Sequence, residues 1–338
     1  MKNKLFAAVC VVQVVILLLT CTFAAAAQSN IADSIDGFIN ETLVFNEKAA
    51  GVETVDEWIN TALVSGAGST SEWYAVALCQ SGEGYNMSAY ANALSDFAAK
   101  NKVTSAVSRQ RLALALIACG RRDDPFVSST ANDSIGEQGI ASLIFGLHLL
   151  NNGCVCDAYS VRDVIDMLLE QRLDDGGWAI TGMVSDVDVT AMALCVLAPY
   201  YNTNEAVADA LDGALELLSN RQLDSGAFKS YGTENPESTS QVIVALCALG
   251  VDVVSDARFI KNGSTLLDGL LKFRLDDGSF SHLEGGAFNY TATVQAFYSL
   301  IAMQRVERGL GSLFVFDMPD ITPPGDASNQ PPSDTPSD

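Results

Sequence analysis

Three stretches of the chain are near copies of one another and follow at intervals of about fifty residues. They read Gln171-Arg-Leu-Asp-Asp-Gly-Gly-Trp178, Gln222-Leu-Asp-Ser-Gly-Ala-Phe228 and Arg274-Leu-Asp-Asp-Gly-Ser-Phe280. Each ends a helical pattern, turns on glycine, places an aromatic ring after the turn and is followed by an apolar run. Self-similarity at a fixed period indicates stacked supersecondary units, and here each unit is a pair of helices.

Apolar residues recur at helical spacing along most of the chain, and almost nothing has the alternation of a strand. One member of each pair, such as Thr190–Ala198, is apolar on nearly all faces and should be buried, whereas its partner, such as Glu205–Arg221, is amphipathic. This predicts an all-α fold with an inner ring of buried helices and an outer ring of half-exposed ones. The twelve expected helices, forming six pairs, are 31–46, 54–64, 71–80, 87–100, 103–119, 137–151, 159–173, 187–200, 204–222, 238–249, 262–274 and 289–308.

The two ends of the chain differ from the middle. Lys2 and Lys4, an apolar run and a cluster of alanines have the layout of a secretory signal over residues 1–27. Lipid attachment at Cys21 is the less favoured alternative. The Pro/Ser/Asp-rich residues 319–338 predict a disordered tail, which leaves 28–318 as the folded domain. No later segment is long and apolar enough to span a membrane, so the expected location is secreted or cell-surface.

The chain is strongly acidic, with a formal charge of −22. Removal of Lys2 and Lys4 with the signal makes the charge −24. Such a surface repels nucleic acid phosphates and anionic membranes. The expected partner is therefore an extracellular ligand or a cell-surface molecule of unknown identity, not nucleic acid.

Six cysteines follow the signal. Cys79, Cys119, Cys195 and Cys247 each lie in an Ala/Leu-rich helical run and are expected to pack as small hydrophobes. Cys154 and Cys156 lie in a polar loop, where each can stay free or pair elsewhere. His148 and His282 are the only histidines, too few to complete a zinc site there. No metal and no cofactor are expected.

The repeat resembles that of the squalene cyclase and protein prenyltransferase superfamily, in which a glutamine caps helix ends and an aromatic ring stacks at the turn. The resemblance covers residues 50–318 and is closest to the secreted bacterial branch with prenyltransferase/squalene-oxidase repeats. Gln171 and Gln222 match the glutamine, and Arg274 stands in its place in the third copy. The resemblance implies a terpenoid cyclase-like α6/α6 toroid around a central cavity. It leaves the activity open, because one scaffold carries many functions.

The cyclase chemistry of this superfamily is the first to test. Asp186-Val-Asp-Val-Thr-Ala191 is similar to the acidic motif of class II terpene cyclases, and Asp188 matches the proton donor. Val189 replaces the aspartate that supports the donor. Protonating an alkene needs a neutral, strongly donating acid in a dry pocket, with aromatic rings to stabilise carbocations. Few rings lie on the expected inner helices, so a cyclase acting on an isoprenoid is the alternative and not the leading interpretation.

Three further chemistries of related toroids fit less well. Prenyltransferases need a zinc ligand set, and His148 and His282 are better interpreted as core or turn residues. Ser134-Ile-Gly-Glu-Gln138 resembles the thioester motif of complement-like domains, but Ile135 replaces the cysteine that forms the thioester. A transcobalamin-like cobalamin-binding module remains an alternative, although its second domain is not evident.

The leading interpretation is a non-catalytic toroid that binds a small molecule, glycan or protein partner. Polar residues at the starts of inner helices should gather at one mouth of the ring, together with the aromatic rings of the repeat turns. The binding candidates are Glu137, Gln138, Trp178, Asp186, Asp188, Thr190, Phe228, Ser240, Gln241, Phe280, Thr293 and Gln295. Only Asp188 is a catalytic candidate, and only if the protein is cyclase-like.

Overall fold

A computed structural model of the chain describes residues 34–316. The expected signal at 1–27, the alternative lipid site at Cys21 and the expected tail at 319–338 lie outside the described residues. The elements after a first helix at residues 34–50 are α2 (Val55–Trp58), the π-helical turn η1 (Ile59–Leu63), α3 (Glu72–Gln80), α4 (Ser88–Lys100), α5 (Ala106–Ala118), α6 (Pro125–Ser134), α7 (Gly139–Asn151), α8 (Val161–Glu170), α9 (Val187–Leu197), η2 (Ala198–Tyr200), α10 (Glu205–Arg221), β1 (Phe228–Ser230), β2 (Thr233–Asn235), α11 (Pro236–Ala248), η3 (Ala257–Phe259), α12 (Leu266–Leu271) and α13 (Tyr290–Glu307).

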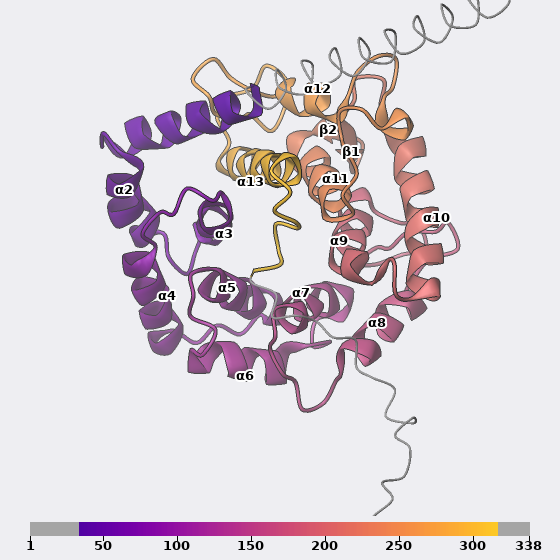
Figure 1. Ribbon diagram of the computed structural model, residues 1–338, viewed down its shortest axis with the longest axis horizontal. Coiled ribbons are helices and arrows are strands. Elements are labelled where there is room, and N and C mark those ends of the chain that lie inside the picture. The colour runs from indigo at the N-terminus through magenta and orange to yellow at the C-terminus, as the bar shows by residue number, and fades with distance from the viewer. Residues whose placement is uncertain (1–33, 317–338) are drawn as a thin grey trace, which may run out of the picture.

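The helices form two concentric rings (Figure 1). The inner ring consists of α3, α5, α7, α9, α11 and α13, each packed on the next, and α13 packs back on α3 to close it. The outer ring holds the helix at residues 34–50, α2, α4, α6, α8, α10 and α12. The expected all-α toroid is confirmed, with a single two-stranded antiparallel hairpin, β1–β2, within the described residues.

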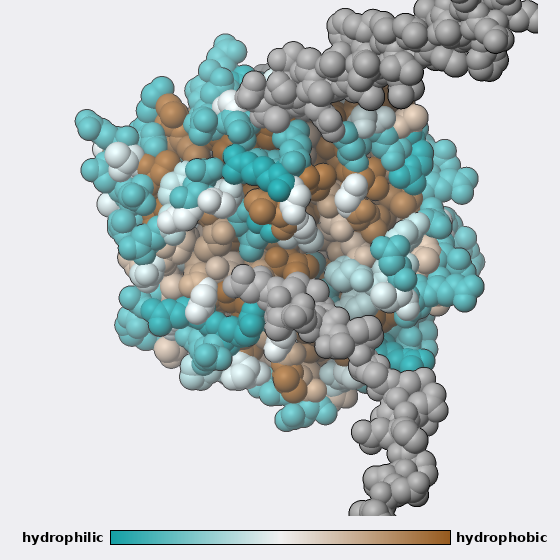
Figure 2. Space-filling model, viewed as in Figure 1, coloured by the Kyte–Doolittle hydropathy of each residue, from teal (hydrophilic) through white to brown (hydrophobic). Residues whose placement is uncertain are grey.

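Burial follows the two kinds of helical pattern. Inner helices α9 and α11 are buried along nearly their whole length, whereas α8 and α10 bury one face and expose the other. Figure 2 shows the same division, with hydrophilic residues prominent around the rim and hydrophobic residues between the helices. Removal of apolar surface from water is thus the main force that holds the rings together.

The sequence pattern predicts no helix between residues 119 and 137, and this is wrong because α6 lies there. Asp124 caps α6 by accepting from the Phe126 N–H at 2.9 Å, and Pro125 occupies its first turn. These are strong start signals, but the Ser/Thr/Asn-rich body of α6 carries little apolar periodicity. The first two expected helices, 31–46 and 54–64, both lie in the outer ring, so they do not form a pair of one inner and one outer helix.

The three repeat turns share one geometry. Gly176, Gly226 and Gly278 have φ of 96°, 86° and 88°, in the left-handed region that favours glycine. After each glycine, the backbone N–H of the aromatic residue donates to a buried threonine hydroxyl of the next inner helix, at 3.0 Å in all three copies. The threonines are Thr190, Thr239 and Thr293.

Each turn also docks on the next outer helix along the ring. A Cβ on Gly226 would lie 2.0 Å from the carbonyl oxygen of Thr265, the residue that caps α12. A Cβ on Gly278 would lie 2.5 Å from the carbonyl oxygen of Glu41 in the helix at residues 34–50. The Thr42 hydroxyl donates to the Gly278 carbonyl at 2.9 Å. The third turn therefore closes the ring by holding its first and last parts together.

In the first two turns, the long side chain that braces the turn stands four residues before the glycine. Gln222 Nε2 donates to the Gly226 carbonyl at 2.9 Å, and Arg172 Nε donates to the Gly176 carbonyl at 3.0 Å. Gln171 is exposed. Gln171 is the C-terminal cap of α8, but its match to Gln222 is out of register by one position. At the position of Gln222 the first copy carries Arg172 and the third carries Arg274.

The position of Arg172, four residues before Gly176, gives a direct prediction for the first repeat. Arg172→Ala is expected to lower the free energy of unfolding by about 1–2 kcal/mol, because it leaves the Gly176 carbonyl without its charged donor. Gln171→Ala is the matched control and should change it by less than about 0.5 kcal/mol. Urea unfolding of both variants measures the difference. A larger loss for Gln171→Ala than for Arg172→Ala would contradict the assignment.

Candidate functional site

Side chains that face the ring interior follow a helical stripe on each of three inner helices, α9, α11 and α13. On α9 the stripe is Asp188, Met192 and Cys195; on α11 it is Glu237, Gln241 and Val244. On α13, Gln295 and Tyr298 continue it. The spacing of four and then three residues places each set on one face of its helix. Since α9, α11 and α13 each follow a repeat turn, the starts of the three stripes lie at the same end of the ring, here called the N-terminal mouth.

Hydrogen bonds join these stripes below the mouth. Gln241 Nε2 donates to the Tyr298 hydroxyl at 2.7 Å and approaches Gln295 Oε1 at 3.3 Å. The Tyr298 hydroxyl donates to Gln295 Oε1 at 3.1 Å. The expected site residues Gln241 and Gln295 thus meet, through Tyr298, which the sequence did not single out.

Carboxylates gather above that network. Glu237 contacts His282 Nδ1 at 2.9 Å, which links α11 to the loop before α13. Asp186 caps α9, and its Oδ2 accepts from the Ser230 hydroxyl at 3.3 Å. Both Asp186 and Glu237 contribute to raising the pKa of Asp188. The three carboxylates therefore form one acidic cluster at the mouth.

Asp188 is the most perturbed acid of this cluster. Burial raises its pKa to about 6; the Ser238 and Ser230 hydroxyls oppose the shift, while Asp186 and Glu237 add to it. Its Oδ1 is buried with no hydrogen-bond partner. Asp188 therefore keeps its proton to a higher pH in the folded protein than it would in water. The aspartate that would support a cyclase donor is nevertheless replaced by Val189, a buried apolar residue.

Asp188→Asn is therefore expected to stabilise the protein at high pH. A pKa raised in the fold gives stability that is present below the unfolded value, near 4, and is lost as pH rises through about 6. At pH 8 the substitution should add about 2 kcal/mol to the free energy of unfolding, and at pH 4 less than about 0.5 kcal/mol. Urea unfolding at both pH values, with exposed Asp209→Asn as control, measures this. An equal effect on stability at both pH values would contradict the raised pKa of Asp188.

A cavity of about 100 Å³ lies on the axis below the acidic cluster. Its lining comes from five inner helices and the C-terminal segment: Trp73, Phe145, His148, Met192, Cys195, Gln241, Val244, Tyr298 and Phe314. The expectation that few rings lie on the inner helices is wrong here, since Trp73, Phe145 and Tyr298 all line the cavity. His148 is buried in this wall, and burial lowers its pKa to about 3, consistent with a core histidine.

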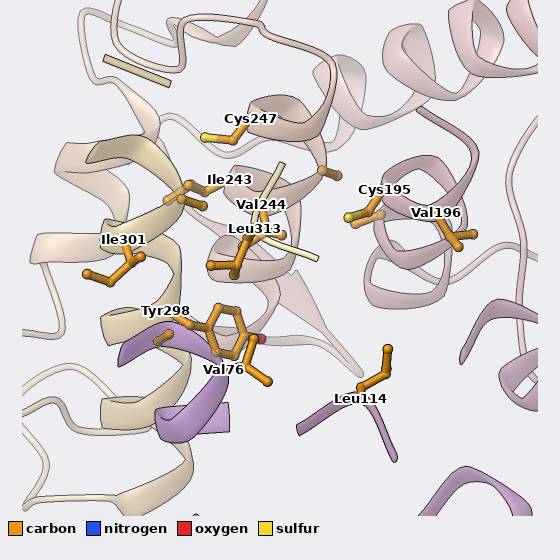
Figure 3. Close-up of a cluster of buried hydrophobic side chains, with 14 of the residues drawn as sticks. Val76, Leu114, Cys195, Val196, Ile243, Val244, Cys247, Tyr298, Ile301 and Leu313 are labelled. Carbon is orange, nitrogen blue, oxygen red and sulfur yellow. The ribbon is translucent and has the colours of Figure 1, made fainter. Parts of the chain in front are cut away.

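The segment after α13 runs inside the ring (Figure 1). Asn152 binds it at two points: its Nδ2 donates to the Phe314 carbonyl at 2.8 Å, and its Oδ1 accepts from the Phe316 N–H at 2.7 Å. Figure 3 shows Leu313 among side chains of α3, α9, α11 and α13 that point into the ring interior. The segment thus fills much of the central space and supplies Phe314 to the cavity wall.

Three loops frame the N-terminal mouth, one before each of α9, α11 and α13. These repeat loops span residues 179–186, 229–234 and 281–289. Lys272 joins the second to the third by contacting Glu234 and Glu284, each at 3.0 Å. They expose Ile180, Met183, Val184, Tyr231, Leu283 and Phe288, with Tyr231 97% and Met183 78% exposed. An open groove of about 600 Å³ lies between the first two loops and is lined in part by Val184, Asp186 and Tyr231.

Several expected site residues have structural positions instead. The rings of Trp178, Phe228 and Phe280 are fully buried in the repeat turns, so they are not available to a ligand at the mouth. Thr190 and Thr293 hold those turns, and Ser240 is buried against Ser299. Gln138 Oε1 accepts from Ser105 and from the Val107 N–H at the start of α5, and Glu137 is exposed beside it.

Glu237 could have been found from the repeat. Counting two residues back from the equivalent threonines gives Asp188 in the first copy, Glu237 in the second and Thr291 in the third. The repeat therefore places a side chain of variable chemistry at the same point of the mouth in each unit. Phe314 had no such signal, because its position depends on the path of the C-terminal segment.

Comparison with protein-family models and with curated protein sequences gives no match. Among solved structures, the chain is similar to ent-copalyl diphosphate synthase from Streptomyces platensis, with a TM-score of 0.48 and 17% sequence identity. The similarity covers 69% of this chain and 49% of the synthase chain, so the chain spans about half the length of that protein. Within residues 34–316, no helix has the length and apolar character needed to cross a membrane.

Proposed function

We propose that the protein is an extracellular, non-catalytic binding module that receives its partner at the N-terminal mouth. The observation that carries this proposal is the set of three repeat loops, which expose large apolar side chains around an acidic cluster. Exposed apolar groups gathered at one end of a rigid scaffold are typical of interaction sites. The scaffold is rigid here because the repeat turns that precede the loops also hold the inner and outer rings of helices together.

The size of the interior favours binding at the mouth over binding within the ring. Ligand pockets usually measure about 300–1,000 Å³, and the central cavity is only about 100 Å³. An isoprenoid chain of the kind that cyclases fold does not fit there while Phe314 lines it. The groove between the first two repeat loops, at about 600 Å³, has room for a larger partner.

The charged residues at the mouth indicate what kind of partner it can bind. Asp186, Asp188 and Glu237 lie within the mouth, and Lys272 is already paired with two glutamates. A partner with apolar side chains and positive charge would match both features. We therefore infer that the mouth binds a cationic, partly apolar segment of another protein.

Selection of a random peptide library on the immobilised protein tests this proposal. The selected peptides are expected to combine Lys or Arg with Leu or aromatic residues, and to bind more weakly as salt concentration rises. A Met183→Ser, Tyr231→Ser, Leu283→Ser triple variant should lose at least about tenfold in affinity. Val155→Ser is the matched control, because Val155 is 74% exposed in the loop that follows α7. Peptides that bind the triple variant as well as the wild type would refute the proposal.

A cyclase-like enzyme remains the second candidate, and one observation favours it: a partly buried Asp188 with a raised pKa stands above a cavity walled with rings. The expected result is nevertheless no cyclic product from squalene or a linear isoprenoid diphosphate, because the cavity is small and Asp188 lacks its supporting acid. Product analysis by gas chromatography measures this. A product that disappears in Asp188→Asn, with the fold intact, would establish the enzyme and overturn the binding module.

A further inference from the structure

The rings of the central cavity form a connected aromatic wall. The centroid of Trp73 lies 5.9 Å from Phe145, 5.7 Å from Phe314 and 6.5 Å from Tyr298. Tyr298 and Phe314 lie 6.4 Å apart. Four rings from α3, α7, α13 and the C-terminal segment therefore border one small space, opposite the sulfur atoms of Met192 and Cys195.

The electrostatic surroundings of this wall favour positive charge. Neither lysine nor arginine lines the cavity, and burial keeps His148 neutral by lowering its pKa to about 3. The pKa of Tyr298 is raised by burial and further by Asp188 and Glu237, so both carboxylates act on the cavity wall. The faces of aromatic rings attract cations, and the attraction is strongest for Trp and in desolvated sites.

The volume limits the cation to a small one. A cavity of about 150 Å³ lined by apolar side chains holds benzene, so about 100 Å³ suits a slightly smaller group. An ammonium that carries methyl groups has that size and presents carbon-bound hydrogens to the rings instead of strong donors that need acceptors. We propose that the cavity binds the methylated ammonium head of a small organic cation, with Trp73 and Tyr298 as its main ring partners.

This proposal goes beyond the mouth function and does not need the repeat loops. Calorimetric titration compares choline with 3,3-dimethylbutan-1-ol, a neutral molecule of nearly the same shape. Choline is expected to bind at least about tenfold more tightly. Equal affinities, or no binding of choline at millimolar concentration, would overturn the proposal, since the first describes an apolar cavity only and the second an inaccessible one.

Two protein variants test the same preference for choline over the neutral alcohol. Trp73→Leu keeps an apolar side chain and should remove the preference for choline. Glu237→Gln lies above the cavity and should weaken choline binding severalfold without changing the binding of the neutral alcohol. If neither variant changes the preference, the assignment is wrong. The Met183→Ser, Tyr231→Ser, Leu283→Ser variant should bind choline as the wild type does, which separates failure of this site from failure of the mouth.

A second inference rests on a different observation, the contact between two thiols. Cys79 near the end of α3 and Cys119 at the end of α5 have their Sγ atoms 3.6 Å apart, and both side chains are half-buried. The bond length of a disulfide is about 2.05 Å. Adjacent inner helices already hold the two sulfurs in contact, so a shift of about 1.5 Å would bring them within bonding distance.

The geometry points to Cys79 and Cys119 as a pair that oxidises to a disulfide linking α3 to α5. The thiolate of one cysteine attacks a small disulfide such as oxidised glutathione, which releases one thiol. The second cysteine then attacks the mixed disulfide and releases the other. Two hydrogen atoms pass to the oxidant, and one bond joins the two inner helices.

Incubation with oxidised or reduced glutathione, followed by peptide mapping without reduction, tests the pair. The oxidised sample is expected to contain the Cys79–Cys119 peptide and to melt several degrees higher than the reduced one. Cys79→Ser should abolish both effects. Cys154 and Cys156, which are also half-buried, serve as comparators within the same chain. Both cysteines remaining free, or pairing with Cys154 or Cys156, would refute the assignment.

Discussion

Gly226→Ala is expected to lower the free energy of unfolding by about 4 kcal/mol or more, which is among the largest effects of a single substitution. Its new Cβ would lie 2.0 Å from the carbonyl oxygen of Thr265 and 2.9 Å from the carbonyl carbon. These are backbone atoms at the cap of α12, so no side chain can rotate away. The turn would have to separate from α12, and the contact between two outer-ring units would open. Chemical unfolding, or loss of soluble protein, measures the effect.

Gly232→Ala is the matched control for that substitution. Gly232 has φ of 84°, close to the 86° of Gly226, but its Cβ would meet nothing within 4 Å. Gly232→Ala is therefore expected to lose about 1–2 kcal/mol of stability, because alanine is strained in the left-handed backbone region, but it has no clash. If the two variants lose equal stability, the close approach of the turn to α12 is not what requires glycine at position 226.

The architecture was predictable because its signals are local. A glycine with positive φ, a ring two residues later and an apolar helix after it are all encoded within about twenty residues, and the period repeats them. Helical periodicity then separates buried from half-exposed helices without knowledge of the whole fold. The same local logic failed at α6, where capping was strong but periodicity was weak, and at Gln171, where two long polar side chains stood side by side.

The candidate site was predictable only in part, because its geometry depends on ring closure. Asp188 and Gln241 could be named from the sequence, since they lie in the first two turns of inner helices. The contacts of Trp73 with Tyr298 and Phe314 join the first inner helix to the last and to the segment beyond it. No local pattern reports such contacts. The rings of the repeat turns were predicted to contribute to binding, but Trp178, Phe228 and Phe280 are fully buried, because a conspicuous aromatic residue can serve packing as well as binding.

Trp178→Ala is expected to cost about 3–5 kcal/mol of unfolding free energy, because the largest ring of the repeat turns would leave a cavity between α8 and α9. The Trp178 side chain is fully buried, and its Nε1 donates to the Leu168 carbonyl at 2.7 Å, in the last turn of α8. The Leu168 carbonyl also accepts from the Gln171 N–H at 3.2 Å, so the indole fills space and adds a second, shorter hydrogen bond to the same acceptor.

Trp178→Phe separates these two contributions, since Phe228 and Phe280 occupy the equivalent positions of the other copies. It keeps a buried ring but loses the bond to Leu168, so it should cost about half as much as the alanine variant. Urea unfolding of both variants is the measurement, with ligand binding at the mouth assayed beside it. A loss below about 1 kcal/mol for Trp178→Ala, together with impaired binding, would return this ring to the functional surface. A large loss of stability with binding retained in Trp178→Phe would place it in the framework that holds the mouth.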